Sequence, residues 1–223
     1  MKRHIYHIIS ILAALLVANS AWGDTLPTPT SENYDLKAGK TYVLDSDMTP
    51  GYLKRWRINL TSNTQEVIVD LNGHTIDAKN IDRAAFNVAR GHLTIIDSKG
   101  GGKIINSIKS AIYVQPSSGN YSTVNFKGGT IENCKPSDAN GGAFDIRDRG
   151  TVNMSDDAII THCLGSNGAA VYLEKGATFN MSGGQIINNR VNAYKDWDPS
   201  TLEPDELPQT TATTGTRGGG CLC

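Results

Sequence analysis

The chain has 223 residues, with 21 lysines and arginines against 22 aspartates and glutamates, so its formal net charge is −1 at pH 7. A charge this close to zero provides no basic field that would recruit DNA, RNA or an anionic lipid surface, so we expect no nucleic-acid partner. The length suffices for one elongated domain.

Residues 1–23 are predicted to be a signal peptide. A basic run at 2–4 precedes an apolar stretch at 8–18 that is too short to span a bilayer comfortably. The small residues Ala21 and Gly23 then place signal-peptidase cleavage before Asp24. No later segment is apolar enough to cross a membrane, so we expect no membrane span in the mature chain. The protein is therefore predicted to be secreted, or held at the cell surface or outer membrane.

The next two segments differ in composition and pattern from the rest of the chain. Residues 24–38 begin with a run rich in threonine and proline, and we predict that they form a flexible leader. Residues 39–66 contain strand-like stretches and Trp56, which stands between Arg55 and Arg57. We predict an N-terminal cap and the first strands here, with Trp56 filling the end of the core.

Residues 67–192 contain a sequence repeat. Its first phrase occurs three times, with starts 28 and then 27 residues apart, as Thr123-Val124-Asn125-Phe126, Thr151-Val152-Asn153-Met154 and Thr178-Phe179-Asn180-Met181. A unit this short cannot bury its own apolar face, so each copy must pack on the next.

A second phrase follows, at 142–146 and 169–173, and upstream segments at 85–88 and 111–114 fit the same pattern. Its apolar residues lie two apart, which is typical of strands with one buried face. A leucine-rich repeat would need a leucine ladder, and a propeller blade needs about 40 residues. The sequence therefore predicts an all-β protein, a right-handed parallel β-helix of about five coils. We expect two inward rows, one of Ile112, Val114, Phe144, Ile146, Val171 and Leu173, and one of Phe126, Met154 and Met181.

Three segments carry a resemblance to a known group of proteins. Gly-Gly-Ala-Phe at 141–144, together with 181–186 and 70–76, resembles bacterial right-handed parallel β-helix proteins of the pectate-lyase-like fold. The first is also similar to repeats of polymorphic outer-membrane proteins and autotransporter passengers. The resemblance implies a secreted surface protein or adhesin. It implies no catalytic residue, because no lyase or galacturonase motif matches.

A long polar insertion at 193–217 interrupts the repeat and is the candidate ligand-binding segment. Tyr194 and Trp197 could stack on a sugar ring while Asp196 and Asp198 accept hydrogen bonds from its hydroxyls. The alternative is a solvated loop without a binding role.

Cys134 and Cys163 occupy nearly equivalent places in successive repeats. In an exported protein they could form a disulfide, or both could fill small apolar sites as free thiols. The sequence leaves these alternatives open.

The acidic cluster Asp156-Asp157 coincides with a turn position, where aspartate is a good turn former, and in the second cluster, at 145–149, Asp148 and Arg149 lie beside Gly150 in a turn. The histidines do not show metal-ligand spacing. We therefore expect no catalytic residue, metal or cofactor, with calcium expected only if the chain is a lyase.

Residues 218–223 are predicted to start a further, incomplete coil in which Cys221 and Cys223 take the positions of Val171 and Leu173. An unfinished coil would leave an unpaired strand edge. We therefore expect end-to-end self-association, or a chain that is part of a longer repeat protein.

Two functions are consistent with these features. The first is an exported, non-catalytic, adhesin-like protein that binds a polysaccharide or a cell-surface protein. The alternative is a polysaccharide lyase or glycoside hydrolase of the pectate-lyase-like fold. An acidic cluster with a nearby arginine or lysine in one open groove would favour the enzyme, and a flank of Thr, Asn and Ser without such a cluster would favour the binder.

Overall fold

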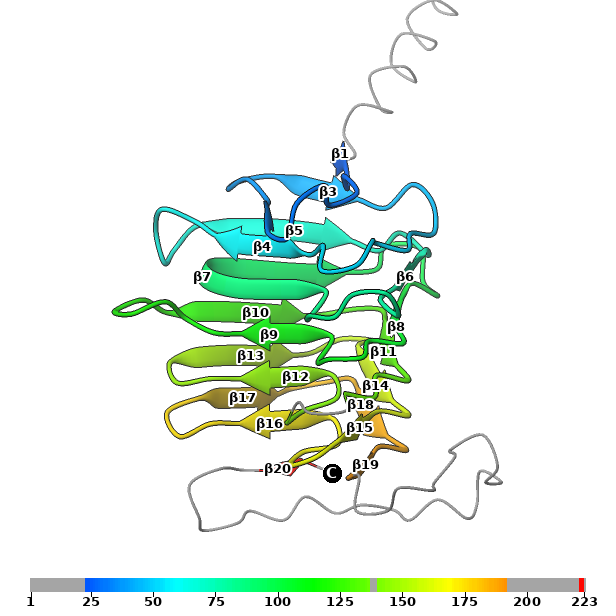
Figure 1. Cartoon of the computed structure of the whole chain (residues 1–223), viewed down its shortest axis with the longest axis vertical. Coiled ribbons are helices and arrows are strands. Elements are labelled where there is room, and N and C mark those ends of the chain that lie inside the picture. The colour runs from blue at the N-terminus through cyan, green and yellow to red at the C-terminus, as the bar shows by residue number, and fades with distance from the viewer. Residues whose placement is uncertain (1–22, 137–139, 192–220, 223) are drawn as a thin grey trace, which may run out of the picture.

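The computed structural model describes residues 23–136, 140–191 and 221–222. Residues 1–22 of the predicted signal peptide and the predicted insertion at 193–217 lie outside these ranges. Every regular element within them is a β-strand, and parallel strands stack into a solenoid of about five turns (Figure 1). The predicted all-β parallel β-helix is confirmed. Across the same ranges, no helix is long and apolar enough to cross a bilayer.

Each full turn contributes one strand to each of three faces, which we name A, B and C. Face A contains β1 (Asp24–Thr25), β3 (Thr41–Val43), β5 (Glu66–Asp70), β10 (Ser122–Phe126), β13 (Gly150–Met154) and β17 (Thr178–Met181). Face B contains β2 (Tyr34–Asp35), β4 (Trp56–Asn59), β9 (Ile112–Val114), β12 (Phe144–Ile146) and β16 (Val171–Leu173). Face C contains β6 (Thr75–Asp77), β8 (Lys103–Ile105), β11 (Thr130–Glu132), β14 (Ile159–Thr161) and β18 (Gln185–Ile187). A short separate pair joins β15 (Leu164–Gly165) to β19 (Arg190–Val191).

The long strand β7 (Phe86–Ile96) passes from face B to face A. Its first part pairs with β9 and its second part with β10. Between them, Gly91 has a φ of +93°, and an added Cβ would lie 2.8 Å from Cδ1 of Leu60. Glycine suits this corner because it adopts positive φ without a steric penalty and brings no side chain into the contact.

Inward side chains of neighbouring strands stack in register and form the core. Both predicted rows are confirmed, as Ile112–Phe144–Val171 with Val114–Ile146–Leu173 on face B, and Phe126–Met154–Met181 on face A. All of these side chains are fully buried except Leu173, which is partly buried, and Met181, which is 48% exposed. The side chains of these rows are therefore exposed to solvent only in the last of the described coils.

The N-terminal cap begins earlier than predicted. β1 pairs with β3 and β2 pairs with β4, while Leu26 and Leu36 are almost fully buried. The prediction of a flexible leader at 24–38 is therefore wrong for residues 24–36. Two leucines that cover the end of the core, together with backbone pairing, order a segment whose threonine and proline content suggested a loop.

Trp56 fills the core beneath this cap, as predicted. It is fully buried, and its ring stacks on Phe86 with centroids 5.0 Å apart. Its Nε1–H donates to the carbonyl oxygen of Pro27 at 2.8 Å, so the buried indole has a hydrogen-bond partner. This bond also ties the cap to β4.

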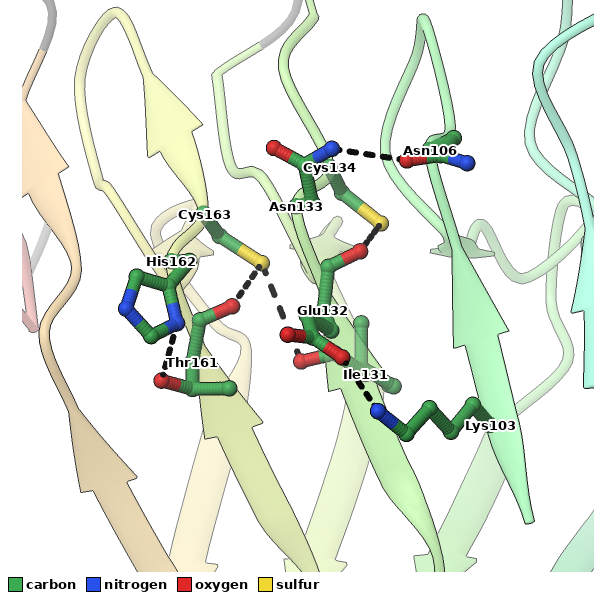
Figure 2. Close-up of polar contacts among 9 residues, drawn as sticks. All are labelled: Lys103, Asn106, Ile131, Glu132, Asn133, Cys134, Thr161, His162 and Cys163. Carbon is green, nitrogen blue, oxygen red and sulfur yellow. Dashed lines mark hydrogen bonds and ion pairs between the residues drawn. The ribbon is translucent and has the colours of Figure 1, made fainter. Parts of the chain in front are cut away.

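Residues in the left-handed conformation turn the chain where it leaves face C. Asn106, Asn133, His162 and Asn188 hold this position in successive coils, with φ between 53° and 59°. Asparagine tolerates the conformation better than most residues do. Nδ2 of Asn133 donates to Oδ1 of Asn106 at 2.7 Å, so two of these turn asparagines are linked between successive coils (Figure 2).

The strand β20 (Cys221–Leu222) runs antiparallel to β16, with Leu222 opposite Val171 and Cys221 opposite Tyr172. For these two residues the prediction that 218–223 begin a further coil is therefore wrong, and the rest of that segment lies outside the described residues. In this arrangement the strand pairs with the edge of β16 without continuing the winding.

The core rows predict unequal effects for two equivalent methionines. Met154→Ala should lower the free energy of unfolding by roughly 2–5 kcal/mol, because it leaves a cavity between two packed coils. Met181→Ala, in the same row but half exposed, should cost roughly 0.5 kcal/mol. Urea denaturation of both variants checks this, and equal losses would contradict the assigned burial.

Candidate ligand-binding groove

Face B presents one row of side chains directed away from the core, because β9, β12 and β16 are only three residues long and alternate residues point to opposite sides. The middle residues pair in register along the solenoid as Arg57, Asn87, Tyr113, Asp145 and Tyr172. The row thus combines charged, amide and aromatic groups.

A groove with a cavity volume of about 290 Å³ lies beside this row. Its walls come from several coils and consist of Arg55, Asp82, Arg83, Ala84, Lys109, Ser110, Tyr113, Asp145 and Arg147. Loops that lead into face B supply residues 82–84 and 109–110, and strands or their ends supply the others. Four cationic side chains therefore line the groove together with two carboxylates, so the net charge of its wall is positive.

Arg147 is held rigidly at the edge of the groove. Its guanidinium carbon lies 5.5 Å from the ring centroids of both Tyr113 and Tyr172, so the cation sits between two aromatic rings. Its Nη2 donates to Oδ2 of Asp145 at 2.8 Å. Nε lies 2.8 Å from Oδ1 but does not point its hydrogen at that oxygen, so this second contact is an ion pair only. The arrangement fixes both rings relative to each other.

Asp145 is the buried charge of the groove. The residue is only 4% exposed, and its Oδ1 has no hydrogen-bond partner. Burial raises the pKa of its carboxyl above the ordinary value, while Arg147 opposes the rise and Glu174 adds to it. The net effect disfavours the ionised form, so the partnership with Arg147 offsets only part of the desolvation.

A second hollow, of about 340 Å³, lies over the turns between faces A and C. Its carboxylates have structural roles. Asp97 accepts hydrogen bonds from the backbone N–H of Gly73 and Gly102, both at 2.7 Å. Asp156 adopts a φ of 54° in the turn between β13 and β14, as predicted for a turn former. The hollow is therefore a consequence of stacked turns.

The binding residues predicted from the sequence belong to the insertion at 193–217. Tyr194, Asp196, Trp197 and Asp198 lie outside the described residues, so their role stays a prediction. Among the residues that the structure does describe, no group of three His, Cys, Asp or Glu side chains could hold a metal ion.

The sequence reasoning missed the groove, although a signal for it exists. The middle position of the second phrase is aromatic at Tyr113 and Tyr172 and acidic at Asp145. The sequence pattern placed Asp145 in an acidic cluster that was assigned a structural role, and it gave the outward-facing Tyr113 and Tyr172 no role beside the inward positions of the phrase. Loop residues such as Arg83 have no repeat signal at all.

Cys134 and Cys163 occupy equivalent positions, since each lies two residues after the in-register pair Glu132 and Thr161. Both are fully buried free thiols (Figure 2). Each donates to the carbonyl oxygen two residues before it, at 3.5 Å for Cys134 and 3.4 Å for Cys163. Burial, and then the neighbouring Cys134, raise the pKa of the Cys163 thiol.

Comparisons of the chain with family models, with curated proteins and with solved structures find no match. The resemblance found in the sequence therefore stands at the level of the parallel β-helix fold.

In the oxidising compartment that the predicted signal peptide implies, we expect the free thiols of Cys134 and Cys163 to join in a disulfide. In-register Cα atoms lie roughly 4.8 Å apart, within the about 4.4–6.8 Å that a disulfide spans. The two thiols lose two protons and two electrons to a disulfide-bonded donor in the export compartment. In protein carrying Cys221→Ser and Cys223→Ser, alkylation after denaturation should label cysteine only after reduction. Labelling of both thiols without reduction would contradict the expectation.

The buried carboxyl of Asp145 predicts that the free energy of unfolding depends on pH. Because its pKa is raised in the folded protein, ionising it lowers stability as the pH rises from the unfolded value of about 4 to the folded value. The free energy of unfolding of Asp145→Asn, relative to wild type, should rise over this range and then level off. Urea denaturation at closely spaced pH values measures it, with the exposed Asp148→Asn as control. A difference that does not change with pH would refute the assignment.

Proposed function

We propose that the protein is exported and binds a polysaccharide in the groove along face B, without cleaving it. The observation that carries this proposal is the arrangement of Tyr113, Arg147 and Tyr172 beside the groove. Sugar rings present C–H surfaces that pack on aromatic side chains, and hydroxyls that bond to charged groups. A concave site with fixed aromatic rings and converging polar groups suits both features.

A polymer fits this surface better than a small molecule does, because the solenoid repeats. Neighbouring strands lie roughly 4.8 Å apart, so face B offers equivalent positions at regular intervals along the axis. Solenoids use such extended surfaces for binding. Together with the predicted export signal, this supports an adhesin-like role at the cell surface.

Face A supports the same function. Asn180 donates to Asn153 and Asn153 to Asn125, each at 2.9 Å, and Asn125 donates to the hydroxyl of Thr94 at 3.0 Å. A flank of stacked asparagine and threonine is the feature that the sequence reasoning associated with a binder. Its side chains are hydrogen-bonded to one another, so they are pre-ordered before any ligand arrives.

The burial of Asp145 argues against catalysis in the groove. A general acid must come within about 3.2 Å of the atom that it protonates, whereas Asp145 is 4% exposed and is held by Arg147. The other carboxylate, Asp82, is engaged by Lys109 at 3.6 Å and by the hydroxyl of Tyr52 at 3.4 Å.

One observation favours the alternative, a polysaccharide lyase or hydrolase. The groove combines a carboxyl of raised pKa with a second carboxylate and several cations, and differently tuned carboxyl pairs are typical of acid–base catalysis. In the lyase version of this alternative, calcium would be the expected cofactor.

The proposal predicts that Tyr172→Ala weakens polysaccharide binding. Loss of one ring of the pair removes a stacking surface and releases Arg147, so the Kd should rise about tenfold, which corresponds to ~1.4 kcal/mol. Titration calorimetry of residues 24–223 against ligands from a polysaccharide array measures it. Tyr121→Ala, at a 58% exposed tyrosine in the loop before β10, is the matched control. Equal affinities of both variants would contradict the placement of the site.

The same polysaccharides decide between binder and enzyme. Incubation with the mature chain, with and without calcium, should release no reducing ends and no unsaturated products. Turnover that disappears in Asp145→Asn would overturn the non-catalytic proposal.

A further inference from the structure

The end of the groove nearest the N-terminal cap contains an arginine whose cross-strand partner is neutral. Strands β2 and β4 pair in register, with Tyr34 opposite Trp56 and Asp35 opposite Arg57. Nε of Arg55, just before β4, donates to Oδ1 of Asn33 at 2.8 Å. This contact places an amide where a carboxylate would neutralise the guanidinium.

The neighbouring pair shows what a neutralised version of the same contact looks like. Two residues further along the same strands, Nε and Nη2 of Arg57 contact Oδ1 and Oδ2 of Asp35 at 2.5 and 2.7 Å. Arg57 and Asp35 thus form a two-point ion pair, the strong geometry for guanidinium and carboxylate. The chain places an acid opposite one arginine and an amide opposite the other.

The groove adds further positive charge around Arg55. Arg83, Lys109 and Arg147 line the same cavity. Lys109 and Arg147 face Asp82 and Asp145, and Arg83 reaches Glu32 at a longer distance of 3.4 Å. At this end of the groove, the positive charges of Arg55 and Arg83 therefore exceed the negative charge of the carboxylates that contact them.

The electrostatics of the two arginines agree with this geometry. Burial, followed by repulsion from Arg83 and Arg57, lowers the pKa of Arg55, and the smaller effects of Tyr113 and Glu32 do not reverse it. The pKa of Arg57 is instead raised, chiefly by its hydrogen bond with Asp35. A half-buried cation without a balancing anion is stabilised by any anion that reaches it.

We infer that Arg55 and Arg83 form a binding site for an anionic group of the polysaccharide, a carboxylate or a sulfate ester. The inference rests on the proposed function, and it adds the chemical class of the ligand. The anion takes the place that Asp35 takes beside Arg57, while the sugar ring extends along the groove toward Tyr113 and Tyr172. A neutral polysaccharide leaves the guanidinium groups unpaired and binds more weakly.

Two matched pairs of ligands test this, since within each pair the backbone is constant and the charge is removed. Polygalacturonate is compared with its fully methyl-esterified form, and dextran sulfate is compared with dextran. Wild type should bind at least one charged form about tenfold more tightly than its neutral counterpart, and this preference should shrink as salt is added. Preference for the carboxylate pair or the sulfate pair identifies the source of the anion, and either supports the inference.

Three single variants locate the effect. Arg55→Gln should remove most of the preference, so that the charged and neutral forms bind with similar affinity. Asn33→Asp should do the same without removing any cation, because it supplies an internal carboxylate to Arg55. Arg57→Gln is the matched control on the same strand and should retain the preference. Thermal unfolding of each variant confirms that it is folded.

The outcomes separate the two proposals. Equal binding of charged and neutral forms by wild type would overturn the anion site while the proposed function stands. Loss of the preference in Arg57→Gln but not in Arg55→Gln would also overturn it. If wild type binds neither these four polymers nor any on the array, the proposed function itself fails.

Discussion

The in-register hydrogen bonding between parallel strands is the constraint on which the rest of the structure depends. Because each coil must satisfy its backbone groups on the next, equivalent residues are forced into rows along the axis. An apolar residue at an inward position then packs on its equivalents, as Phe144 does between Ile112 and Val171. The same pairing brings outward residues from coils roughly 30 positions apart in the chain into contact, so the repeat that builds the core also builds the surface rows.

This constraint separates what the core needs from what the surface does. On face B each strand directs one middle residue away from the core, and that residue can change without altering the inward row. Tyr113, Asp145 and Tyr172 differ in chemistry although the residues on either side of each are apolar. The loops that enter face B are under even less restraint, and they contribute Arg83 and Lys109 to the groove. The chemistry of this surface can therefore vary while the inward rows stay apolar.

The sequence predicted the parts of the structure that repeat and failed where the repeat ends. The phrases at Thr123, Thr151 and Thr178 align residue for residue in the structure, because in-register pairing demands equal spacing between strands. Residues 24–36 carried no repeat signal, and their order comes from two buried leucines and pairing with distant strands. The prediction for β20 failed for a related reason. Alternation of apolar residues does not distinguish parallel from antiparallel pairing, and β20 pairs antiparallel to β16. The groove escaped prediction because part of its wall comes from loops without a repeat signal, such as those that carry Arg83 and Lys109.

The charges of the groove fall into two kinds, and their difference bears on function. Asp145 and Arg147 neutralise each other within the protein, and Arg147 in turn fixes two tyrosine rings, so this pair shapes the site. Arg55 has only an amide opposite it, although the next equivalent contact along β4 shows that the backbone geometry there accommodates a carboxylate. A half-buried charge that the fold could neutralise but does not is stabilised by an anion from outside the chain. The contrast between Asn33 and Asp35 is therefore more informative about the ligand than the groove's volume or its number of cations.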